Sequence, residues 1–156
     1  MPRGWQEVVP GIRIHMGRLR RAARALGLQV IFLFGSRARG RPHGASDVDL
    51  AVRAASPRWR DWRWQLRCIR ELAEAVEGAE VDVAFLNQAS PELLWEACQG
   101  ILLYEDQPLR GASLRSYALR LYEDHEKLRR AALRALRRSH GRPKASRRSA
   151  RETPEP

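Results

Sequence analysis

Two aspartates separated by a single residue, Asp47 and Asp49, lie in the stretch FGSRARGRPHGASDVDLAV, residues 34–52. Side chains alternate across a β-strand, so both carboxylates are expected on one face while the apolar residues between them point into the core. The two Cα atoms would then be about 6.5 Å apart. Carboxylates this close repel each other unless a positive charge lies between them. Oxygen ligands of this kind suit a hard cation such as Mg²⁺ or Mn²⁺.

A third carboxylate, Asp82, occurs in the later apolar run EVDVAFL. Its neighbours Val81 and Val83 are expected to face the core, which turns Asp82 to the other side. If this strand pairs with the strand that carries the first two aspartates, all three carboxylates share a face. Their charge of −3 would be balanced by two divalent cations and a nucleoside triphosphate, which is the layout of two-metal phosphoryl chemistry.

A glycine–serine pair, Gly35–Ser36, follows the apolar run QVIFLF and precedes an arginine-rich turn. Glycine allows a ligand to approach the backbone closely, and the N–H groups of such a turn can surround an anion. Ser36 adds a hydroxyl, and the arginines of the turn, Arg37, Arg39 and Arg41, supply positive charge for phosphate oxygens. Each feature alone is a weak signal, but their combination with the aspartates predicts a nucleotide-phosphate site.

The remaining pattern predicts a small α/β or α+β layer in which a mixed sheet packs with helices mainly on one face. A Rossmann fold is not expected, because no GxGxxG follows the first strand. Helical periodicity predicts a second helix that starts at Ser56–Pro57, ends at Gly78 and buries a stripe including Trp59, Trp62 and Leu66. The other expected elements are a helix over 10–27, strands over 29–34, 46–52 and 80–86, a short helix over 91–99, an extended piece over 101–106, and a long final helix from 113 to about 138.

Composition and charge predict one folded domain, residues 1–139, followed by a basic and flexible tail, residues 140–156. Of the net charge of +11, residues 127–156 carry +9, from 11 Lys/Arg and 2 Asp/Glu. Nucleic acid is therefore expected to bind, if at all, through the tail. No apolar run approaches the length of a membrane span and no signal peptide is recognisable. Cys68 and Cys98 are expected to be reduced, buried thiols of a cytoplasmic protein.

GSRARG, the following SDVDLAV and the later VDVAF together resemble the nucleotidyltransferase superfamily related to DNA polymerase β. The chain is most similar to its minimal nucleotidyltransferases, the MNT or MntA-type proteins, from the first helix to about Tyr122. This resemblance implies that Asp47, Asp49 and Asp82 are catalytic and hold two Mg²⁺ ions. It also implies that Asp82 helps to deprotonate the acceptor hydroxyl. The residues expected to bind the ATP substrate are Gly35, Ser36, Arg37, Arg39 and Ser46.

The implied activity is transfer of AMP from ATP to a hydroxyl acceptor, with release of pyrophosphate. Minimal members are commonly encoded beside a HEPN-domain ribonuclease toxin, so the expected acceptor is a tyrosine of such a partner, held in a hetero-oligomer, and the expected role is that of an antitoxin. Three alternatives remain open: a small-molecule enzyme of the aminoglycoside-modifying type, a non-catalytic module that sequesters a toxin, and a nucleic-acid binder built on the tail.

Overall fold

The computed structural model describes residues 4–40 and 47–140. The chain divides into two compact units, residues 1–123 and 124–156. The final helix begins in the first unit and ends in the second. In chain order the elements are β1 (Trp5–Val9), β2 (Ile12–His15), α1 (Met16–Leu26), β3 (Leu28–Phe34), α2 (Gly35–Ala38), β4 (Val48–Ala54), the 3₁₀ turn η1 (Pro57–Arg60), α3 (Trp62–Ala73), β5 (Val76–Glu77), β6 (Val81–Phe85), the 3₁₀ turn η2 (Leu86–Gln88), α4 (Pro91–Cys98), β7 (Ile101–Glu105) and α5 (Arg110–His140).

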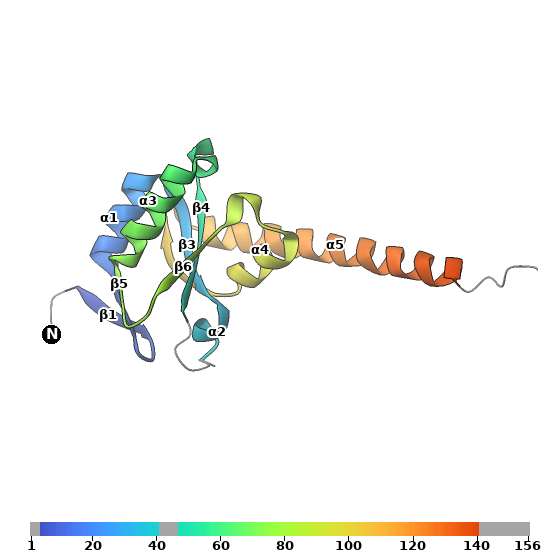
Figure 1. Cartoon of the computed structure of the whole chain (residues 1–156), viewed down its shortest axis with the longest axis horizontal. Helices are drawn as coiled ribbons and strands as arrows, with labels where there is room; N and C mark the ends of the chain where they lie inside the picture. The colour runs from blue at the N-terminus through green and yellow to red at the C-terminus, as the bar shows by residue number, and fades with distance from the viewer. Residues whose placement is uncertain (1–3, 41–46, 141–156) are drawn as a thin grey trace, which may run out of the picture. The chain divides into compact units, whose positions relative to one another are not determined.

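A four-stranded mixed sheet in the order β6-β4-β3-β7 forms the centre of the first unit (Figure 1). β3 pairs antiparallel with both β4 and β7, whereas β4 and β6 run parallel. All but one of the residues of β3 are buried, as its continuous apolar run predicts for a strand covered on both faces. The small mixed sheet expected from the sequence is therefore confirmed.

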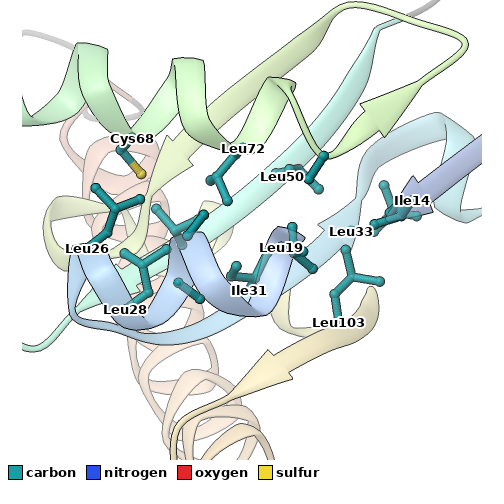
Figure 2. Packing of buried hydrophobic residues seen from close by; sticks show 14 of the residues in the cluster. Ile14, Leu19, Leu26, Leu28, Ile31, Leu33, Leu50, Cys68, Leu72 and Leu103 are labelled. Atoms are coloured by element: carbon teal, nitrogen blue, oxygen red, sulfur yellow. The ribbon is translucent and has the colours of Figure 1, made fainter. Parts of the chain in front are cut away.

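Helices cover both faces of this sheet, so the expectation of helices mainly on one face is wrong. α1 and α3 bury their apolar residues against one face, where Leu19, Leu26 and Leu72 meet Leu50 and neighbouring side chains (Figure 2). α4 and the beginning of α5 cover the opposite face, around Phe32 and Ala97. The two faces of β3 alternate between these cores, and a strand with apolar residues at every position requires cover on both sides.

A second sheet, β1-β2-β5, lies outside the sequence prediction. The helix expected over 10–27 begins only at Met16, because residues Ile12–His15 form β2. Ile12 and Ile14 are fully buried and their neighbours are not, which is the two-residue period of a strand and not that of a helix. The Nδ1 atom of His15 accepts a hydrogen bond of 3.2 Å from the backbone N–H of Arg18 and so caps the start of α1.

The second helix also differs from its prediction, and the difference changes which side chains are buried. Ser56–Pro57 begins only the short turn η1, and Asp61 starts α3 by accepting a 2.9 Å hydrogen bond from the backbone N–H of Arg63. This break shifts the helical phase. Trp62 and Leu66 are therefore 60% and 57% exposed, whereas the buried residues of α3 are Trp64, Cys68 and Leu72. The helix ends at Ala73, and β5 follows where more helix was expected.

The remaining elements agree with their predictions within a few residues. Ser90 caps α4, where its Oγ atom accepts a 3.2 Å hydrogen bond from the backbone N–H of Leu93. Both cysteines are free and buried. Over residues 4–40 and 47–140, no helix is long and apolar enough to cross a bilayer. The predicted basic tail lies, from residue 141 onward, outside the described residues.

Candidate active site

Asp49 on β4 and Asp82 on β6 are register partners in the parallel pair of strands. Partners in a parallel ladder direct their side chains to the same face of the sheet. Ala51, two residues after Asp49 on that face of β4, packs in the core beneath α4 and α5. The two aspartates therefore belong to the α4 side of the sheet, while the alternate residues of β4 pack beneath α1 and α3: Val48, Leu50 and Val52.

Burial and neighbouring charges both act on the carboxyl group of Asp49. Asp82 and Asp47 are exposed, whereas Asp49 is half-buried. Burial is the largest cause that raises the pKa of the Asp49 carboxyl above its ordinary value, and the negative charges of Asp82 and Asp47 raise it further. Glu96 adds to this effect and the positive charge of Arg39 opposes it. Three carboxylates thus act on Asp49 in one direction and one guanidinium, that of Arg39, acts in the other.

Gly35 lies directly against this cluster, at the first position of α2. Phe34, the residue before it, pairs with Asp49 across β3 and β4. The φ angle of Gly35 is +75°, and a Cβ atom added there would collide with the Asp49 carboxylate, with only 3.0 Å to its Cγ atom. Both the backbone conformation and the lack of space therefore require glycine. Ser36 follows at the next position of the same short helix and is half-buried.

An ion pair and a cavity adjoin Gly35 on the side of α4. The Nη2 atom of Arg39 lies 3.1 Å from Oε1 of Glu96. Both residues line a cavity of about 220 Å³, together with Phe34, Gly35, Ala38, Gln99, Gly100 and Ile101. Sequence reasoning predicted Arg39 here but missed Glu96 and Gln99. Glu92 and Glu96 both occur in the same short helix, and no pattern in the sequence indicates which carboxylate reaches Arg39.

The described residues include most, but not all, of the predicted site. Arg37 is half-buried in α2, beside Ser36. Ser46, together with Arg41 and His43 of the arginine-rich turn, falls in residues 41–46, outside the described part of the chain. The assignment of Ser46 to nucleotide binding stays a prediction.

The donor chemistry of the cluster fits a magnesium ion. Asp49 and Asp82 offer carboxylate oxygens side by side, and the carboxylates of Asp47 and Glu96 are close enough to act on Asp49. Magnesium is commonly bound by one or two carboxylates together with the phosphates of a substrate. Within residues 4–40 and 47–140, no three acidic, histidine or cysteine side chains are arranged as a complete metal-binding group. Asp49 and Asp82 thus supply oxygen ligands of the kind magnesium uses but do not form a complete site by themselves.

Comparison with known proteins matches the part of the chain that builds this site. A family model described as polymerase beta, nucleotidyltransferase matches residues 22–109. Protein adenylyltransferase MntA of Shewanella oneidensis is 40% identical over 75 residues, which are 48% of this chain and 49% of MntA. The chain thus spans about half the length of this curated relative.

Solved structures extend the similarity of fold over most of the chain. A crystal structure of a toxin–antitoxin with AMP-PNP matches this chain with a TM-score of 0.63 at 25% identity. The match covers 79% of this chain and 98% of the chain in that structure. The crystal structure of the toxin–antitoxin MntA–HepT has a TM-score of 0.58 at 22% identity and covers 78% of this chain and 95% of its own, which shows a shared fold. The family match covers more than half of the chain and contains all three aspartates and the glycine–serine pair. This chain therefore belongs to the polymerase beta nucleotidyltransferase family.

Proposed function

We propose that this protein is an antitoxin that transfers AMP from ATP to a tyrosine hydroxyl of a partner HEPN ribonuclease, in a reaction that requires magnesium. The observation that carries the proposal is the pairing of Asp49 with Asp82 beside Gly35. Membership of the nucleotidyltransferase family gives the reaction class. The curated relative is named a protein adenylyltransferase, which supports a protein acceptor.

The HEPN partner is supported by what similar solved structures contain. One is described as a toxin–antitoxin with AMP-PNP, an analogue of ATP. Another is described as a tri-AMPylated Shewanella oneidensis HEPN toxin in complex with an MNT antitoxin, with a TM-score of 0.58 at 22% identity. A protein that modifies its partner in a complex has an acceptor held at its active site. We therefore place the acceptor tyrosine on a bound protein rather than on a free small molecule.

Each residue of the site has a role in binding the metal or the nucleotide. Asp47, Asp49 and Asp82 would hold two magnesium ions, which when bound neutralise phosphate charge and activate the attacking oxygen. Gly35 leaves the backbone open to the triphosphate, and Ser36 offers it a hydroxyl. Arg37 and Arg39 supply guanidinium groups for phosphate oxygens, and Ser46 extends this set from the segment before Asp47.

The reaction itself is an in-line displacement. The tyrosine oxygen attacks the α-phosphorus of ATP, the bond to the oxygen that bridges the α and β phosphates breaks, and pyrophosphate leaves. The proton of the tyrosine hydroxyl passes to Asp82, which is exposed beside Asp49 and can accept it. Positioning of the two substrates and neutralisation of charge supply most of the rate.

The test is incubation of the protein with ATP, Mg²⁺ and its HEPN partner, followed by intact mass spectrometry of the partner. We expect the wild-type protein and Glu80→Gln to add adenylate, and Asp82→Asn to add none. Glu80→Gln is the matched control, because it removes an exposed carboxylate two residues before Asp82. Equal labelling by Asp82→Asn would overturn the assignment. Labelling of an aminoglycoside but of no protein would favour the small-molecule alternative, and toxin binding without any transfer would favour the sequestering one.

A further inference from the structure

α1 and α3, which cover the face of the sheet opposite to the aspartates, carry an unusual excess of arginine. Residues Met16–Leu26 contain four arginines and no acidic residue, and residues 57–73 contain five arginines and two acidic residues. All nine arginines are exposed. Arg20 and Arg24 line a separate pocket with Leu102–Glu105 on the β7 side of α1. The other seven, which we call the arginine face, are Arg18, Arg21, Arg58, Arg60, Arg63, Arg67 and Arg70.

Most of this positive charge has no carboxylate partner. Within the described residues, Arg67 is the only member of the arginine face that forms an ion pair, with 2.6 Å between its Nε atom and Oε1 of Glu71. The other acidic residue of the segment, Asp61, uses its carboxylate to cap α3. On the opposite face of the sheet, the carboxylates of Asp47, Asp82 and Glu96 gather around Asp49.

The arginine face contains a groove between its two helices. α1 and α3 lie side by side over the sheet (Figures 1 and 2). The groove has a volume of about 500 Å³, and Arg18, Arg21 and Arg70 line it from the two sides. Glu71 and Glu74 also line it; Glu71 is paired with Arg67, so three guanidinium groups of the lining face the one remaining carboxylate, that of Glu74. Guanidinium groups on both walls of a groove suit a chain of phosphates, because each group can donate two hydrogen bonds to one phosphate.

Two aromatic rings adjoin these arginines, the exposed Trp62 at the start of α3 and the half-buried Trp59 of η1, which also packs against the core. Trp62 is 60% exposed, and the guanidinium carbon of Arg63 lies 5.0 Å from the centroid of its ring. Arg60 is placed in the same way over Trp59, at 5.1 Å. An exposed indole offers a flat face on which any nucleobase can stack, and arginine beside it supplies charge for the phosphate. An acidic peptide would use the arginines but would leave Trp62 in water.

We propose that the arginine face binds single-stranded nucleic acid, with the arginines of the α1–α3 groove on the phosphates and Trp62 stacked on a base. The surface lies on the face of the sheet opposite to Asp49 and Asp82, so this binding needs neither ATP nor magnesium. It is also separate from the basic tail, to which the sequence alone assigned any contact with nucleic acid.

The test measures binding of a fluorescein-labelled oligouridylate of about 16 nucleotides to the full-length protein by fluorescence anisotropy over a series of salt concentrations. We expect Arg21→Gln/Arg70→Gln to weaken binding about 10-fold and to reduce the slope of log K against log salt by about 1.4, which corresponds to two fewer phosphate contacts. Trp62→Ala is expected to weaken binding about 10-fold with the salt slope unchanged, because it removes stacking and no charge.

The matched control is Arg120→Gln/Arg134→Gln, which removes two exposed arginines from α5 and leaves the arginine face intact. We expect it to bind within about 2-fold of wild type, since non-specific attraction by net charge changes little. An equal loss in this control, an unchanged affinity in Trp62→Ala, or equally tight binding of a polyglutamate peptide would each overturn the proposal. Circular dichroism of each variant verifies that the fold is retained.

Discussion

Arg39 and Glu96 are 57 positions apart in the sequence, yet an ion pair of 3.1 Å joins them at the rim of the cavity beside Gly35. Their side chains are 62% and 46% exposed, so water screens the pair and its contribution to stability is small, about 0–1 kcal/mol. The structural effect of the pair is to hold the guanidinium of Arg39 between α2 and α4. Glu96 is thus a positioning residue for an arginine expected to contact phosphate.

We predict that Arg39→Gln raises the KM for ATP about 10-fold and that Glu96→Gln raises it only about 3-fold, with kcat little changed. The double variant should be no worse than Arg39→Gln, because Glu96 acts through Arg39. Steady-state kinetics of all four proteins measures this. Fully additive effects in the double variant would show that Glu96 contacts the substrate independently.

A second prediction concerns Asp49, whose carboxylate is half-buried among like charges. The pKa of this carboxyl is raised, mainly by burial and then by Asp82, so its charged form is less stable in the folded than in the unfolded protein. Asp49→Asn should therefore abolish transfer and yet raise the Tm of the metal-free protein. Addition of Mg²⁺ with a non-hydrolysable ATP analogue should raise the Tm of wild type but not that of the variant. A lower Tm in Asp49→Asn would contradict this explanation.

Gly35→Ala tests whether the backbone before Ser36 must be free of a side chain. The added Cβ would collide with the Asp49 carboxylate at a φ of +75°, so we expect a loss of about 2–3 kcal/mol of stability together with loss of transfer. Gly27→Ala is the control, because Gly27 has a φ of +66° and nothing within 4 Å of the added atom. It should lose about 1 kcal/mol and keep full activity. Urea unfolding and an AMP-transfer assay compare the two.

Two tryptophans separated by one residue test the phase of α3. Trp64 is 8% exposed and packs near Phe85, with ring centroids 5.9 Å apart, whereas Trp62 is 60% exposed. Trp64→Ala should destabilise the protein by about 3–5 kcal/mol and Trp62→Ala by less than about 1 kcal/mol. Urea unfolding measures both values. If Trp62→Ala lost more stability than Trp64→Ala, the observed helical phase would be contradicted and the phase predicted from the sequence would be supported.

The two cysteines should be inert in the folded protein. Burial raises the pKa of the Cys68 thiol from 9.0 to about 12 and that of Cys98 to about 11. The thiolate is the reactive form, so at pH 8 neither thiol should react with Ellman's reagent until urea unfolds the protein. The raised pKa values also mean that these groups contribute stability below pH 9, and that this contribution is lost as the pH rises toward 11–12. Fast reaction of either thiol under native conditions would contradict their placement.

The elements that carry the site could be predicted because their signals are local. The apolar run of β3, the alternation in β4 and β6, and the glycine after β3 each depend on neighbouring residues. The alternation of apolar and polar residues alone predicts that Asp49 and Asp82 point away from the core beneath α1 and α3. Their pairing is not local, and only the structure shows that they stand side by side.

The errors arose where two local signals compete. Ile12 fits the helical spacing of Met16 and Leu19, but Gly11 with its φ of +77° turns the chain, and Ile12 enters a strand. In the same way Asp61 restarts the helix after η1, and this shifts every later position. Glu96 could not be predicted, since its partner Arg39 lies on a distant segment and only the tertiary fold brings the two together.

Because β4 and β6 pair directly, the alignment of Asp49 with Asp82 does not depend on the length of the chain segment that connects the two strands. Backbone hydrogen bonds between the strands align Asp49 with Asp82, whereas η1, α3 and β5 cover one face of the sheet and return the chain to its edge. Substitutions at the exposed positions of α3 would therefore leave the carboxylates aligned, provided that Trp64, Cys68 and Leu72 keep the helix packed on the sheet. The alignment of the two carboxylates thus depends on the strand pairing itself, and only the exposed positions of the intervening helix can vary without disturbing the core beneath it.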